Sequence, residues 1–132
     1  MNLLIDIGNS RTKIALADFA EINQVTNYNK FNKSVLSSCL MNNSEIQFGI
    51  ISAVKELDKA LIKFIASKVN SLTILDKDTP LPYRNNYRSK NSLGNDRIAA
   101  LAGACNIFPG ENVLVIDAIF STTLSRGSRY RC

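Results

Sequence analysis

The chain has 132 residues, enough for one domain with a buried core. Hydrophobic residues make up 45% of it and charged residues 20%, which is typical of a soluble globular protein, and no run of about 18 apolar residues predicts a membrane span. The three cysteines show no C-x-x-C spacing and histidine is absent, which disfavours a zinc site and excludes Ser-His and Cys-His catalysis.

The net charge of +5 is unevenly distributed. The segment from Ile119 onward contributes three arginines and no acidic residue, so residues 1–118 carry a net charge of only +2. A scattered basic excess of this size is typical of solvated surface, and we do not expect a nucleic-acid partner. An aspartate as early as Asp6, without a basic leader, argues against a signal peptide and predicts a cytoplasmic protein.

The first third of the chain predicts strands joined by tight turns. Residues 2–6 are a short apolar run, residues 8–10 have turn composition, and residues 12–17 alternate in polarity, so the three together predict a β-hairpin. A weaker strand is expected around residues 24–28, and a short helix at residues 33–41.

The middle third predicts a parallel strand–helix–strand unit. We expect a buried strand at residues 47–54, a helix at residues 55–69 capped by Ser52 or a neighbour, and a strand at residues 71–75. The expected helix has one apolar stripe, at i, i+4, i+7 and i+8: Leu57, Leu61, Phe64 and Ile65.

The last third begins with a polar stretch, residues 76–92, whose length favours a functional loop. A helix rich in small residues is expected at residues 95–107, and a buried strand that ends in an acid at residues 112–117. The order of elements predicts an α/β fold with a mixed sheet that opens on a hairpin. The glycine-rich loops of dinucleotide-binding and P-loop folds are both absent.

The predicted first turn combines groups that suit a phosphate. Its amides and the side chains of Asn9, Ser10 and Thr12 could line a phosphate, and Asp6 could hold a metal directly or through water. A plain hairpin with Gly-Asn in its turn remains the alternative. The candidate residues are Asp6, Ile7, Gly8, Asn9, Ser10, Arg11, Thr12 and Lys13.

Two further acids are candidate site residues. Asp96 lies in the first turn of the expected helix, where it could accept a proton from a substrate hydroxyl, while Arg97 and the free amides could bind an anion. An acid there also complements the helix dipole without any further role. Asp117 ends an expected apolar strand, as Asp6 does, and the two strand ends could meet at one site. The alternative is that the strand before Asp117 simply ends where the chain reaches solvent.

Three motifs in order resemble those of the type III pantothenate kinase family. Asp6-Ile7-Gly8-Asn9-Ser10 matches its D-x-G-N-[ST] motif. Residues 81–88 (Leu-Pro-Tyr-Arg-Asn-Asn-Tyr-Arg) and 93–97 (Leu-Gly-Asn-Asp-Arg) match its substrate loop, and residues 98–104 its small-residue helix. The resemblance covers residues 1 to about 118.

The resemblance implies a ribonuclease H-like, actin-type ATPase domain, the first of two, and ATP-dependent phosphorylation of pantothenate, the first step of coenzyme A biosynthesis. It implies that Asp6 to Lys13 line the ATP phosphates, accompanied by Mg²⁺, and that Asp96 accepts the proton of the pantothenate hydroxyl. It also implies a homodimer. The pantothenate contacts would be Tyr87, Gly94, Asn95, Asp96 and Arg97, and Asp117 would bind a monovalent cation, K⁺ or NH₄⁺.

The resemblance breaks off after Ala118. The family continues with Gly-Thr, whereas this chain has Ile119-Phe120-Ser121-Thr122-Thr123 and then an arginine-rich tail. We therefore divide the chain into an N-terminal kinase half-domain, residues 1–118, and a divergent tail, residues 119–132. A truncated or frame-shifted product with impaired activity is expected. A non-catalytic binding or regulatory module on the same fold is the alternative.

Overall fold

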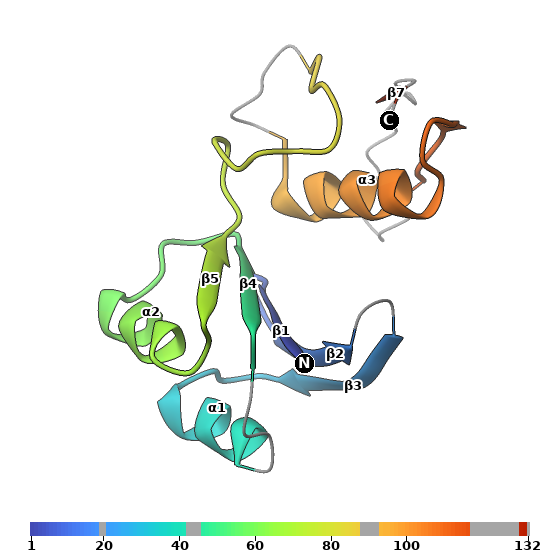
Figure 1. The fold of residues 1–132 in the computed structure, drawn as a ribbon. Helices are drawn as coiled ribbons and strands as arrows, with labels where there is room; N and C mark the ends of the chain where they lie inside the picture. Colours follow the sequence, from blue (N-terminus) through green and yellow to red (C-terminus); the bar gives the residue numbers. More distant parts are fainter. Residues whose placement is uncertain (19–20, 42–45, 88–92, 117–129, 132) are drawn as a thin grey trace. The chain divides into compact units, whose positions relative to one another are not determined.

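The computed structural model describes residues 1–18, 21–41, 46–87, 93–116 and 130–131 (Figure 1). The chain forms two compact units, Met1–Leu75 and Asp76–Cys132. In the part of the chain described here, no helix is long and apolar enough to cross a bilayer.

The first unit is built on a five-stranded mixed sheet with the order β3-β2-β1-β4-β5. The first two strands form the predicted antiparallel hairpin, whereas β1 with β4 and β4 with β5 are parallel, which confirms the α/β class and the strand–helix–strand unit. The strands are β1 (Asn2–Ile7), β2 (Thr12–Asp18), β3 (Glu21–Tyr28), β4 (Phe48–Ala53) and β5 (Ser71–Ile74).

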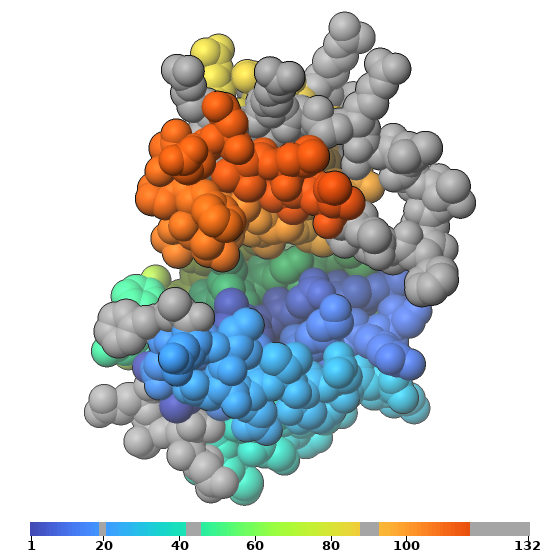
Figure 2. Space-filling model, turned by 90° about the vertical axis from the view of Figure 1, so that its right-hand side faces the viewer, coloured from blue at the N-terminus to red at the C-terminus, as the bar shows by residue number. Residues whose placement is uncertain are grey.

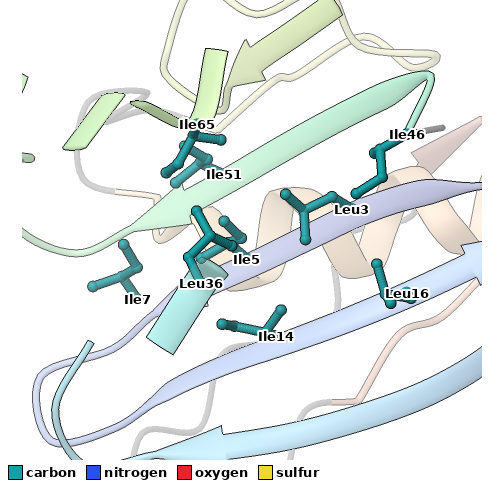
Figure 3. Packing of buried hydrophobic residues seen from close by; sticks show 9 residues of the cluster. All are labelled: Leu3, Ile5, Ile7, Ile14, Leu16, Leu36, Ile46, Ile51 and Ile65. Atoms are coloured by element: carbon teal, nitrogen blue, oxygen red, sulfur yellow. The ribbon is translucent and has the colours of Figure 1, made fainter. Parts of the chain in front are cut away.

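Two helices, α1 (Lys33–Leu40) and α2 (Lys59–Ala66), bury their apolar side chains against one face of this sheet (Figure 3). Leu36 of α1 and Ile65 of α2 are 0% and 1% exposed, and they belong to one core cluster with Ile51 of β4, which is 0% exposed. The predicted apolar stripe also packs on this core, although its first member, Leu57, precedes α2. The other buried members of the cluster come mainly from the hairpin: Leu3, Ile5, Ile7, Ile14, Leu16 and Ile46.

Helix α2 is shorter than predicted, because it begins at Lys59 and not at residue 55. Asp58 has extended backbone dihedrals, and its carboxylate accepts a hydrogen bond from the amide of Ala60 at 3.0 Å, so it is the N-cap in place of Ser52. Ser52 instead lies inside β4. The four residues between β4 and Asp58 are therefore free to form a loop at the end of the sheet.

Strand β3 is longer than predicted, since it begins at Glu21 and not near residue 24. It is an edge strand that pairs with β2 and with no other strand among the described residues. Its first five residues are exposed, and they contribute to the light-blue surface of Figure 2. A change of register between Leu16 and Ala17 of β2 marks a bulge. Such irregularities are common at sheet edges.

Replacing the N-cap residue of α1 should weaken the first unit. The Asn32 carboxamide oxygen accepts a hydrogen bond from the amide of Val35 at 3.0 Å. We expect Asn32→Ala to lower the free energy of unfolding by about 1 kcal/mol, and Asn32→Asp, which keeps an acceptor, to lower it far less. Urea denaturation of both variants tests this, and equal losses would show that the cap contributes nothing.

The second unit has a small core around helix α3 (Asn95–Ile107). Leu101 and Cys105 of the helix pack with Tyr83 from the preceding loop, and the Tyr83 hydroxyl donates to the carbonyl of Ile98 at 3.4 Å. The helix therefore has the bounds predicted from its pattern of small and apolar residues, and the proline-containing loop contributes to its packing.

The strand predicted at residues 112–117 is confirmed only at its first two residues, and the prediction is wrong for residues 114–116. Strand β6 has only two residues (Asn112–Val113), and it pairs with β7 (Tyr130–Arg131) in a separate two-stranded sheet. Leu114 and Ile116 are 63% and 79% exposed. Within the described residues no strand pairs with residues 114–116, and an apolar sequence alone does not supply a partner strand.

The second unit begins with a polar turn, residues 76–79, in which the carboxyl group of Asp76 accepts hydrogen bonds. Hydrogen bonds from the Thr79 hydroxyl and then from the Asp78 amide lower the pKa of the Asp76 carboxyl from its ordinary value of 3.8. Because the pKa of Asp76 is lower in the folded chain than in the unfolded chain, the ionised carboxylate stabilises the turn at pH values above the pKa of the unfolded chain. This stabilisation is lost as the pH falls through the pKa of the folded chain.

We expect Thr79→Val to raise the pKa of the Asp76 carboxyl towards 3.8, because the largest of these hydrogen bonds is then removed. Carboxyl-carbon NMR titration measures the shift directly. Thr73→Val in β5 is the matched control and should leave the Asp76 titration unchanged. An unaltered pKa of Asp76 in Thr79→Val would contradict the assignment of the cause.

Candidate active site

The turn between β1 and β2 is tight and is held on both sides. The Gly8 amide donates to the carbonyl of Arg11 at 3.0 Å, and the Val54 amide after β4 donates to the carbonyl of Ile7 at 3.1 Å. A Cβ atom on Gly8 would lie 3.1 Å from the Arg11 carbonyl oxygen, closer than ordinary contacts allow. Glycine therefore permits the close approach of the two backbones in this turn.

This turn lies at the end of the sheet where parallel strands finish. β1 and β4 end together, with Ile7 beside Ala53, and β3 ends beside Thr12 at the start of β2. The strand order also reverses here, because β2 and β3 extend to one side of β1 whereas β4 and β5 extend to the other. In α/β sheets ligands bind outside the carboxyl ends of strands at such a reversal point.

A pocket of about 430 Å³ opens at this position, within the first unit. Six of the eight residues predicted for the phosphate site line it, namely Ile7 to Thr12. Its other walls are two loops and one side chain of α2: Asn29, Lys30 and Phe31 after β3, Lys55, Glu56, Leu57 and Asp58 after β4, and Leu61. The pocket thus combines turn amides, hydroxyl and amide side chains, cations and an apolar wall.

The remaining two predicted residues, Asp6 and Lys13, do not line this pocket. They are register partners in neighbouring strands, and both are exposed, whereas Ile7 and Thr12 are buried. Because side chains alternate along a strand, Asp6 and Lys13 point away from the sheet face that carries Ile7 and Thr12. The structure therefore brings the eight residues into one turn but divides their side chains between two faces.

Sequence reasoning missed the two loops that complete the pocket. They carry no motif, and residues 55–57 were assigned to a helix that in fact begins later. The strand directions could have indicated these loops, because both loops follow strands that run parallel to β1 and therefore end at the same edge of the sheet. The pairing of these strands is a tertiary property, however, and local patterns did not reveal it.

A second group of candidate residues surrounds the start of α3, in the other unit. Gly94 is the N-cap, with extended dihedrals and no side-chain hydrogen bond, and the exposed Asp96 carboxylate accepts from the amide of Arg97 at 2.8 Å. A Cβ atom on Gly94 would collide with this carboxylate. Glycine at this position therefore leaves space for the Asp96 side chain over the helix start.

The loop before α3 places Tyr87 at the surface, 40% exposed, with its amide donating to the carboxamide of Asn85 at 3.0 Å. Asn95 and Arg97 are half-buried at the helix start. Asp117, the predicted cation ligand, lies outside the described residues. Among the residues that are described, no three acidic, histidine or cysteine side chains form a metal-binding group.

An α/β domain with a tight glycine-containing turn, and with a pocket lined by lysine and arginine at the carboxyl edge of its sheet, is a candidate nucleotide-binding domain. The family model for type III pantothenate kinase matches residues 2–126, and the chain belongs to this family. The family resemblance inferred from the motifs is thereby confirmed.

The chain is similar to three relatives named type III pantothenate kinase. The one from Bacteroides fragilis is 37% identical over 123 residues, and the alignment covers 89% of this chain and 48% of the relative. Those from Christiangramia forsetii and Flavobacterium psychrophilum are 38% and 32% identical, with 89% of this chain and 49% of each relative covered. The chain spans about half the length of the curated relatives that it matches.

Proposed function

We propose that this chain provides the N-terminal half of an enzyme that phosphorylates pantothenate with ATP. The observation that carries the proposal is the pocket at the carboxyl edge of the sheet, because Ile7 to Thr12 of the family's phosphate motif line it. Membership of the type III pantothenate kinase family supplies the reaction. The fold is then the ribonuclease H-like, actin-type ATPase domain that the resemblance implies, a finer assignment than the mixed sheet alone supports.

In this proposal the β1–β2 turn binds the phosphates of ATP. The exposed amides and side chains of Asn9 and Ser10 donate to phosphate oxygens, and Arg11 offsets their charge. Asp6 is exposed and has no ion-pair partner in the described part of the chain, but its side chain points away from the sheet face that carries Ile7 and Thr12. Its carboxylate would therefore contact the Mg²⁺ that accompanies ATP through a water molecule, outside the pocket.

Asp96 acts as the proton acceptor for the hydroxyl of pantothenate. Phosphoryl transfer depends chiefly on holding the hydroxyl in line with the γ-phosphate and on offsetting charge, so one positioned carboxylate suffices without histidine. The helix start fixes this carboxylate through the amide of Arg97. Tyr87 and residues 94–97 then contact pantothenate. The reaction requires the β1–β2 turn and the start of α3 to face one another, which stays a prediction because they lie in different units.

Four features of the whole enzyme also stay proposals. They are a K⁺ or NH₄⁺ ion at Asp117, a homodimer, a cytoplasmic location, and the division into a kinase half-domain (1–118) and a divergent tail (119–132). The tail replaces the Gly-Thr of the family motif by Ile119-Phe120, so low activity of this chain on its own follows.

Backbone-amide NMR of the labelled chain tests the nucleotide site without requiring turnover. We expect MgATP to shift the amide signals of residues 7–12, and pantothenate to shift those of residues 94–97. Adenosine, which lacks phosphates, is the matched control and should leave the turn signals in place. If MgATP moves no signal in residues 7–12 at millimolar concentration, the proposed nucleotide site is wrong.

A further inference from the structure

Three separate loops each contribute one cationic side chain to the pocket beside the β1–β2 turn. Arg11 belongs to the turn itself, Lys30 to the loop after β3 and Lys55 to the loop after β4, and all three line the same space. We call these residues the cationic rim. Only Arg11 belongs to the phosphate motif, so the two lysines are unexplained by it.

The charge of the cationic rim is only partly offset by carboxylates of the protein. In the described residues, none of the three side chains has an ion-pair partner within 4.0 Å, and all three are exposed. The acids of the pocket are Glu56 and Asp58. Asp58 is engaged as the cap of α2, with its carboxylate on the amide of Ala60. This hydrogen bond does not remove the charge of Asp58, so three cations against two carboxylates leave the pocket a net charge of +1.

The other lining residues indicate which anion fits. The apolar side chains of Ile7, Phe31, Leu57 and Leu61 form part of the wall. Apolar walls lower the local dielectric constant and strengthen charge–charge attraction. Three cations from separate loops suit an extended anion with several charges better than a single carboxylate, because an extended chain reaches more than one of them.

We propose that Lys30 and Lys55 bind the polyphosphate chain of the nucleotide together with the β1–β2 turn. This inference rests on the proposed function, since it takes nucleotide phosphates as the ligand. The two lysines are binding residues and not proton acceptors. Glu56 lies at the same pocket and acts against them, because its carboxylate repels the same anion.

Titration of the labelled chain with tripolyphosphate at low salt, followed by amide NMR, measures the contribution of each charge. We expect Lys30→Ala and Lys55→Ala each to weaken binding roughly two- to fivefold, as exposed ion pairs do. Glu56→Gln should tighten binding by about twofold, an effect of opposite sign that a loss of folding cannot produce. Raising the ionic strength should reduce all these differences, because salt screens exposed charges.

Lys63→Ala is the matched control, since Lys63 is an exposed lysine of α2 that does not line the pocket. It should bind tripolyphosphate like the parent chain. Dispersed amide spectra of all variants establish that each is folded.

The failures of the two proposals are distinguishable. If Lys30→Ala and Lys55→Ala bind as tightly as the parent chain while the signals of residues 7–12 still shift, the lysine inference is wrong and the nucleotide site stands. If Lys63→Ala weakens binding as much as they do, the effect is one of net charge and the inference is again wrong. If tripolyphosphate and MgATP shift no signal of the turn in the parent chain, both proposals fail.

Discussion

Replacement of Asp96 by asparagine is expected to reduce pantothenate phosphorylation roughly 10²- to 10⁴-fold, the usual contribution of a positioned general base. Asparagine retains an oxygen that can accept from the Arg97 amide, which the carboxylate now does at 2.8 Å, so the start of α3 should persist. The loss should therefore fall on kcat, with little change in the affinity for pantothenate.

The measurement requires a protein of the relatives' length, because this chain spans about half of it. A chimera of residues 1–117 with the second half of the Bacteroides fragilis relative meets this need. Asp78→Asn is the matched control, an exposed aspartate of the same unit outside the candidate site, and it should keep full activity. Activity of Asp96→Asn within threefold of the parent chimera would rule out its role as proton acceptor. It would favour a non-catalytic role for this helix start.

Truncation of Ile51 to alanine is expected to have the largest effect on stability. Its side chain is fully buried on the central strand β4, between Ile65 of α2 and the hairpin core (Figure 3). Removing three carbons from such a site costs about 2–5 kcal/mol, because it removes buried surface and leaves a cavity. The free energy of unfolding of a small domain is only about 5–15 kcal/mol, so this loss is a large fraction of it and should lower the denaturation midpoint sharply.

Two variants calibrate this result. Ile51→Val removes one carbon at the same place and should cost about 0.5–1.5 kcal/mol. Ile50→Ala lies one residue earlier on the same strand, where the side chain is 37% exposed, and should cost less than Ile51→Ala. Denaturant titration with circular dichroism gives all three values. Equal losses for Ile50→Ala and Ile51→Ala would mean that the core does not lie on the face shown here.

Local patterns predicted most of the elements, because the signals that define them lie within a few residues. The alternation of residues 12–17 and the turn at residues 8–10 gave the hairpin, and the small and apolar residues of 95–107 gave α3 with its correct bounds. The prediction for α2 was wrong at its start because Leu57 shares the apolar stripe although it precedes the helix. The capping hydrogen bond of Asp58 decides the boundary.

The candidate site was predicted only in part, for a related reason. The motif at residues 6–13 is contiguous, so the sequence could identify it, and the family match confirms the resemblance on which it rested. Lys30 and Lys55 are far apart in the sequence, and only strand pairing brings their loops to one pocket. The exposed apolar residues Leu114 and Ile116 show the reverse case, because their pattern predicts a strand and no partner strand is present among the described residues.

The sequence by itself determined the family, the α/β class and the chemistry available, which without histidine comes from carboxylates, cations, hydroxyls and backbone amides. Only the tertiary structure decided that Ile7 and Thr12 share a pocket while Asp6 and Lys13 face the other way, and which loops complete that pocket. The physical reason is that composition and periodicity are local, whereas a pocket forms where strands distant in the chain end side by side.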